Sequence, residues 1–214
     1  MLNIFEHNTL FYIAASLGFI HTILGPDHYL PFIALSKANR WSLTKTFLIT
    51  TLCGLAHTLS SVFIGFVGVL IMQRLKEVNL IESFRGELAI WLLISMGFIY
   101  LIWGIKSAKN LKLNTSNNNL IALVMFIIFV LGPCEPLIPL MMHPLASNDA
   151  FLLLATVSIF VIATVSTMLG IVLIPLYFFR SLKFKVPLLG VKYAHAFAGA
   201  VILLCGLSMK LFGL

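Results

Sequence analysis

The chain alternates long apolar segments with short polar connections. Six segments dominated by apolar residues lie near 9–35, 46–72, 88–105, 120–143, 151–179 and 191–212. Each is close to the roughly 20 residues that a helix needs to cross a bilayer. The pattern therefore predicts an all-α integral membrane protein with six transmembrane helices.

Composition supports this prediction. The 214 residues are 60% hydrophobic and 10% charged, with a mean hydropathy of +1.06, whereas soluble domains have about 25% charged residues. The first apolar segment is expected to be a membrane span and not a secretory signal, because Glu6 precedes it without any Lys or Arg. The three cysteines lie in apolar segments and form no CxxC motif.

The net charge is +7, and most of the basic residues lie in alternate connections between the apolar segments. The first, third and fifth connections and their flanks hold ten of them: Lys37, Arg40, Lys45, Lys106, Lys109, Lys112, Arg180, Lys183, Lys185 and Lys192. Basic residues favour the cytoplasmic side, so both termini are expected outside, in the inner membrane of a bacterial or archaeal cell. No nucleic-acid partner is expected.

Two stretches of the chain are versions of one another. The sequence GPDHYLP at 25–31 recurs as GPCEPLIP at 132–139. The similarity continues between 56–61 and 162–167, and then between two pairs of glycines, Gly97 and Gly104, Gly199 and Gly206. Duplication predicts a first three-helix repeat at 1–112, a polar linker at 113–119 and a second repeat at 120–214.

Each expected repeat has three spans, so the two must insert with opposite orientations and form an inverted repeat. Pro26 and Pro133 lie inside spans one and four, where they are expected to break the helices. A broken helix within a bilayer is tolerated where protein or a water-filled cavity satisfies the freed backbone. The alternative is an ordinary six-helix bundle whose glycines only allow close packing.

Asp27 and Glu135 are the acidic residues expected within spans, while the other five acidic residues are assigned to ends or connections. No Lys or Arg is expected near the middle of a span to neutralise these two carboxylates. Charged groups inside a membrane mark ion pathways or proton relays. Asp27 and Glu135 therefore predict a site for a cation or for protons.

Three histidines accompany the carboxylates: His21, His28 and His57. Imidazole suits Ni, Co, Cu, Zn or Fe better than Mg or Ca. His21 and His28 would lie about 10 Å apart on an unbroken helix, so both can bind one ion only if the Gly-Pro break brings them together. Cys134 is interpreted either as a further metal ligand or as a small buried residue.

The two Gly-Pro breaks, at 25–30 and 132–138, are expected to approach each other near the axis that relates the repeats. His57 from the second span, and Thr164 and Ser166 from the fifth, are expected to face this meeting point.

The stretch 18–28, followed by CGLAH at 53–57, resembles the nickel/cobalt transporter superfamily, and most closely its small urease-accessory-like and sulfite-exporter-like members. Permeases of that superfamily have a histidine followed by an Asp-His pair in an early span, a motif associated with metal recognition. The resemblance implies nickel or cobalt as the transported substrate. Gly132-Pro133-Cys134 also resembles membrane thiol–disulfide carriers, which use one cysteine in each half.

Three functions are therefore weighed. The favoured one is a secondary transporter of a divalent transition metal, nickel or cobalt, working by alternating access around the midplane. The alternative is a proton-coupled exporter of a small anion such as sulfite, but no basic residue is expected at mid-span to hold the anion. A transmembrane electron carrier would need a second cysteine where Asp27 stands.

The chain has no P-loop or other nucleotide-binding motif, so no ATP hydrolysis and no enzyme activity are expected. No tightly bound cofactor is expected beyond the transported metal. The expected partners are the lipid bilayer and the metal ion, with a homo-oligomer left open.

Overall fold

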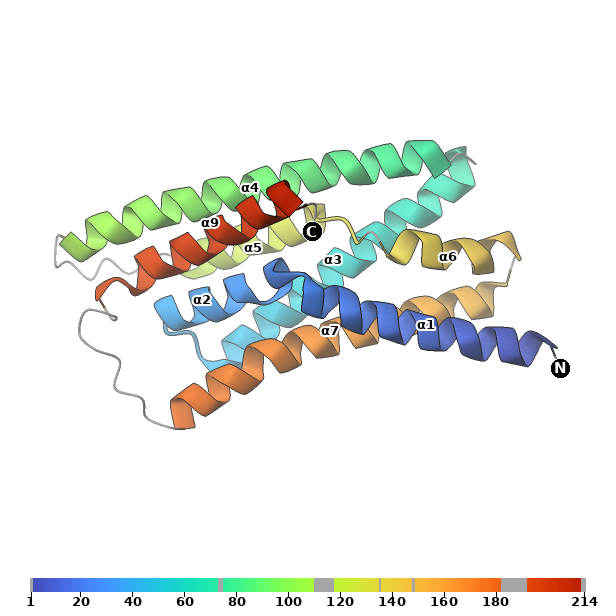
Figure 1. Cartoon of the computed structure of the whole chain (residues 1–214), viewed down its shortest axis with the longest axis horizontal. Helices are drawn as coiled ribbons and strands as arrows, with labels where there is room; N and C mark the ends of the chain where they lie inside the picture. The colour runs from blue at the N-terminus through green and yellow to red at the C-terminus, as the bar shows by residue number, and fades with distance from the viewer. Residues whose placement is uncertain are drawn as a thin grey trace.

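The structure is a computed structural model that describes residues 2–72, 75–109, 118–134, 136–147, 149–181 and 192–212. Within these ranges all regular structure is helical, and Figure 1 shows most of the helices along the long axis of the molecule, with α3 crossing them obliquely. The elements in chain order are α1 (Leu2–Leu24), η1 (Pro26–His28), α2 (Leu30–Ala38), α3 (Leu43–Met72), α4 (Leu75–Lys109), α5 (Asn118–Leu131), α6 (Leu137–Ala146), α7 (Ala150–Ser181) and α9 (Ala194–Phe212). Of the predicted linker, 113–117 lies outside the described residues.

Among the described residues, four helices are long and apolar enough to cross a membrane: Leu43–Val67, Leu80–Ala108, Ala150–Phe179 and Ala194–Phe212. A fifth candidate span is the bent pair His7–Leu24 and Pro26–Ala38, whose halves meet at 85°. Large apolar side chains cover the outer surface, for example Phe151 and Leu154 on α7, which are 74% and 68% exposed. Such a surface is suited to lipid, and the chain is a helical membrane protein.

Both Gly-Pro stretches interrupt helices, as the sequence predicted. α1 ends at Leu24 and η1 begins at Pro26, while α5 ends at Leu131 and α6 begins at Leu137. Pro26 and Pro133 have no backbone N–H to continue a helical ladder. The predicted segment 120–143 is consequently two short helices, of 14 and 10 residues.

The start of α4 differs from the sequence prediction. Glu82 was assigned to an end or a connection, and Arg85 precedes the predicted span at 88–105, but both lie inside α4 and are only 4% and 8% exposed. Apolar side chains on the same turns face outward instead: Leu80, Ile81, Phe84 and Leu88 are 69%, 41%, 71% and 40% exposed. Charged residues of a membrane helix are stable where they face protein and pair with one another, so this stretch continues the span.

Glycines allow α4 and α9 to lie in direct backbone contact, and Figure 1 shows the two helices side by side. A Cβ added at Gly97 would overlap the backbone nitrogen of Leu203. A Cβ added at Gly199 would overlap the backbone nitrogen of Leu101. These approaches are closer than any other residue would permit.

A second set of contacts repeats this relationship nearer the helix ends. A Cβ at Gly104 would meet the backbone of Ala196, and one at Gly206 would meet the backbone of Ile94. The contact of Gly104 with Ala196 corresponds to that of Gly206 with Ile94, because the two glycines are 102 residues apart in the chain and so are their two partners. The contacts of Gly97 and Gly199 correspond in the same way. The packing of α4 on α9 is thus reciprocal and antiparallel.

Candidate metal centre

The break after α1 turns His28 back towards the chain that precedes it. Gly25 has φ −89° and ψ 94°, and Pro26 begins η1. A Cβ at Gly25 would overlap Nδ1 of His28. Glycine therefore leaves room for the imidazole, while proline removes a helical hydrogen bond. Together they produce the 85° bend.

Three histidines meet beside this break. The ring centroids of His21 and His28 lie 4.6 Å apart, and those of His28 and His57 lie 5.0 Å apart. The rings of His21 and His57 are parallel at 6.2 Å. On a continuous helix His21 and His28 would be about 10 Å apart, so their predicted approach is observed and results from the break.

The two buried histidines direct the same nitrogen at each other. Nδ1 of His28 lies 3.2 Å from the carbonyl oxygen of Gly25 and 3.2 Å from Oδ1 of Asp27. His57 hydrogen-bonds the backbone of Phe129. The Nε2 atoms of His28 and His57 are 3.3 Å apart. If one ring carries its proton on Nε2, the two atoms form a hydrogen bond; if both rings carry it on Nδ1, two Nε2 lone pairs face one another, an arrangement that a shared cation stabilises.

Cys134 reaches the same place from the break after α5. Its Sγ lies 3.9 Å from Nε2 of His21, and its backbone N–H donates to Oγ of Ser61 at 2.9 Å. One donor atom from each of His21, His57 and Cys134 lies within 4.8 Å of the others. Nitrogen and sulfur ligands of a tetrahedral ion stand about 3.3–3.6 Å apart, so a small closure would let these donors hold one metal.

Asp27 approaches the centre through His28. A carboxylate that accepts a hydrogen bond from a ligating histidine fixes the orientation of the ring and raises its basicity. The 3.2 Å contact between Asp27 and Nδ1 of His28 has this geometry. The sequence predicted Asp27 as a metal ligand; in the structure it contacts Nδ1 of His28 and also lines the cavity described below. Glu135, the second expected carboxylate, lies outside the described residues.

The centre faces a cavity of about 690 Å³. Its polar lining includes His21, Asp27, His28, His57, Glu82 and Glu87. The side chain of Glu87 is 50% exposed and pairs with Lys210 at 2.7 Å. The cavity therefore connects the buried histidines with a carboxylate at the protein surface.

A buried ion pair borders this cavity, and sequence analysis missed it. The guanidinium of Arg85 donates to Oε1 of Glu82 at 2.5 Å, to Oγ of Ser60 at 2.9 Å and to the carbonyl of Val130 at 2.6 Å. The signal was present in the sequence as the helical spacing of apolar residues around Glu82 and Arg85. Hydropathy alone ends the span at these charges.

The two α7 residues expected at the centre have different positions. Thr164 is fully buried and faces α1, where a Cβ at Gly18 would lie 3.1 Å from its Oγ1. Ser166 is exposed and donates to the carbonyl of Ile162 in its own helix. The prediction for Ser166 was wrong, because its position on α7 lies on the outer face.

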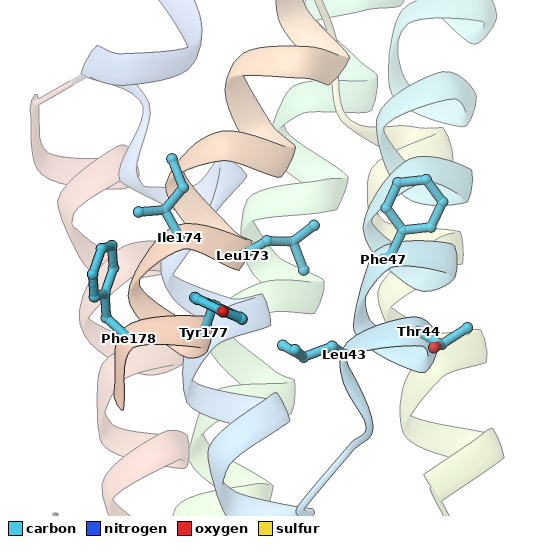
Figure 2. A pocket seen from close by; sticks show the side chains of 7 residues that line it. All are labelled: Leu43, Thr44, Phe47, Leu173, Ile174, Tyr177 and Phe178. Atoms are coloured by element: carbon cyan, nitrogen blue, oxygen red, sulfur yellow. The ribbon is translucent and has the colours of Figure 1, made fainter. Parts of the chain in front are cut away.

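A second cavity, of about 580 Å³, lies between the start of α3 and the end of α7. Figure 2 shows the side chains around it: Leu43, Thr44, Phe47, Leu173, Ile174, Tyr177 and Phe178. Two hydroxyls are the polar side-chain groups of this lining. Among the described residues, none that lines this cavity is a histidine, a cysteine or an acidic residue, so the cavity is suited to a lipid chain and not to an ion.

Comparison of the chain with protein-family models, with curated proteins and with solved structures gives no match. The function is therefore argued from the centre itself.

Proposed function

We propose that the protein is a secondary transporter of a divalent transition-metal cation, nickel or cobalt, which binds among His21, His28, His57 and Cys134. The observation that supports this most strongly is the 3.3 Å approach of Nε2 of His28 to Nε2 of His57 in a buried position. With the proton of each ring on Nδ1, both Nε2 atoms are free to bind a metal ion held between them.

The donor set favours a borderline or soft ion. Imidazole nitrogen and thiolate sulfur suit the later first-row metals and Zn, whereas Mg and Ca prefer oxygen. Among these metals, nickel and cobalt are chosen because the stretch 18–28 resembles the nickel/cobalt superfamily. Asp27 orients His28 and supplies negative charge, and Glu135 would add a second carboxylate.

Movement of the ion requires a site that opens to each side in turn. We place it at the junction of two inverted three-helix repeats, with α1–α2 as span one and α5–α6 as span four. The reciprocal glycine contacts of α4 and α9 support such an axis. So does the packing of α1 on α7 and of its counterpart α5 on α3. This arrangement has six spans, and the distribution of the basic residues would place both termini outside.

The cavity favours a path to the centre from the side of Glu87. It extends from the histidines to this half-exposed carboxylate. An ion would lose its water stepwise between the carboxylates of the cavity and the histidines at its base.

A proton-coupled exporter of a small anion such as sulfite is the second candidate. Arg85 favours it, because a buried cation near the cavity was not expected from the sequence. However, Glu82, Ser60 and Val130 already accept hydrogen bonds from the guanidinium. An anion would have to displace Glu82, which makes metal transport the better-supported proposal.

Uptake into proteoliposomes separates the two functions. Vesicles containing the purified protein and a trapped metal indicator should respond to external Ni²⁺ or Co²⁺ and not to Mg²⁺, and the His28→Ala variant should not respond. Sulfite flux driven by a pH gradient, without any metal response, would reject metal transport.

A further inference from the structure

The end of α5 lacks a hydrogen bond that a continuous helix would have. The N–H of Cys134 would donate to the carbonyl of Val130 in a regular α-helix. It donates instead to Oγ of Ser61 on α3. This exchange turns the chain at Gly132 and Pro133, and it directs the thiol of Cys134 towards His21.

Arg85 supplies the donor that the carbonyl of Val130 would otherwise have received from the N–H of Cys134. Its guanidinium donates to the carbonyl of Val130 at 2.6 Å and to Oγ of Ser60 at 2.9 Å. Helix ends leave carbonyl groups that need a partner, and a cation at this end also interacts favourably with the helix dipole. Arg85 therefore caps α5 from a different helix and ties it to α3.

Two further contacts hold Arg85 in this position. Glu82, one turn earlier on α4, is buried and accepts a hydrogen bond from the guanidinium. A Cβ at Gly86 would lie 3.0 Å from Cγ of Pro133, so α4 packs directly on the break. The planar fork of arginine can serve Glu82, Ser60 and Val130 together, which lysine with its single nitrogen cannot do with the same geometry.

We propose that Arg85 is a positioning residue for Cys134: by capping Val130 it fixes the break after α5 and holds the thiol beside His21. Glu82 balances the charge of Arg85 and keeps the guanidinium on α5. The consequence for a bound metal rests on the proposed function, whereas the position of the thiol does not.

The first test measures the thiol without any metal. In a background of Cys53→Ala and Cys205→Ala, Cys134 of the purified protein in detergent should react slowly with N-ethylmaleimide, because it is fully buried. Arg85→Lys should accelerate the reaction at least about tenfold. Lys210→Gln, which breaks the Glu87 ion pair on the same cavity without touching α5, should not.

A double variant separates positioning from folding. Arg85→Lys leaves a charge in a changed environment, whereas Glu82→Leu with Arg85→Met removes both charges and keeps apolar volume, a replacement that buried ion pairs often tolerate. The double variant should elute as a monodisperse protein and still expose Cys134 to the reagent. A reaction rate equal to that of the parent protein would overturn the proposal.

The second test asks whether the position matters to a metal. With Co²⁺ bound, the parent protein should show a thiolate-to-cobalt absorption band, and the double variant should lose most of it while keeping the visible absorption due to the histidines. If the parent protein bound no Co²⁺, the transport proposal would fail, but the alkylation result would still decide the role of Arg85. Equal thiolate bands in parent and double variant would contradict that role.

Discussion

Nε2 of His28 lies 3.3 Å from Nε2 of His57, although 29 residues separate the two histidines in the chain. Oxygen acceptors from Gly25 and Asp27 fix the first ring, and the backbone of Phe129 fixes the second. Both Nε2 atoms therefore face the same small volume, and a ring with its proton on Nδ1 presents a lone pair there. In the proposed function, a metal ion would bind in this volume.

Metal binding should stabilise the fold. A ligand that binds the native state alone adds about 2.7 kcal/mol at 100 times its dissociation constant. Ni²⁺ or Co²⁺ should thus raise the thermal midpoint of the detergent-solubilised protein, and chelation should reverse the effect. His57→Ala should lose this response, while His143→Ala, at an exposed position on α6, should keep it. Equal responses in both variants would place the metal elsewhere.

Asp27→Asn should weaken metal binding without removing a ligand. Loss of a group that orients a ligating histidine costs about 10–100-fold in affinity. An amide can still contact Nδ1 of His28, but it lacks the negative charge and can present its NH₂ group instead of oxygen. Isothermal titration with Co²⁺ should show this loss and a larger one for His28→Ala. If Asp27→Asn bound metal as tightly as the parent protein, the carboxylate would have no part in the site.

The Gly-Pro breaks were predictable because glycine and proline act locally, and the meeting of His21 with His28 followed from the first break. The contact of Asp27 with Nδ1 of His28 was not predictable, because it depends on the 85° bend and on how the ring of His28 folds back over Gly25. Spacing along the chain does not determine such an angle.

The Glu82–Arg85 pair shows a different limit of sequence reasoning. Charges were interpreted as the end of a span, because an isolated charge is costly in a bilayer. Here each charge is neutralised by the other inside the protein, so the cost of burying them is much lower than for an isolated charge. Only the outward apolar face of α4, seen at Phe84 and Leu80, distinguishes this case from a surface connection.

Cys134→Ser should distinguish a metal site from a redox carrier. The serine oxygen is a poorer ligand for a borderline metal than thiolate sulfur, so metal affinity should fall while the histidines still bind. Metal uptake by Cys134→Ser should be reduced but measurable, and the loss of uptake should be smaller than in His28→Ala. A thiol–disulfide carrier would instead lose all activity and would form a mixed disulfide through Cys134 in a trapping assay.

Gly97→Ala and Gly199→Ala should destabilise the protein to similar extents. Each added methyl group would overlap backbone across the α4–α9 contact, and overpacking costs about 1–3 kcal/mol. Gly170→Ala is the matched control, since its nearest neighbour would be 4.0 Å away. Thermal unfolding of the three variants measures the effect. A large loss for one contact glycine and none for the other would contradict reciprocal packing.

Titration of the purified protein with Co²⁺, followed by absorption spectroscopy, tests the proposed metal centre most directly. We expect saturable binding of one ion per chain, with the intense visible absorption of tetrahedral cobalt and a near-ultraviolet thiolate band. His57→Ala should change the visible absorption, and Cys134→Ser should abolish the thiolate band. Weak absorption identical to that of hydrated Co²⁺, at every metal concentration, would contradict a metal centre at His21, His28, His57 and Cys134.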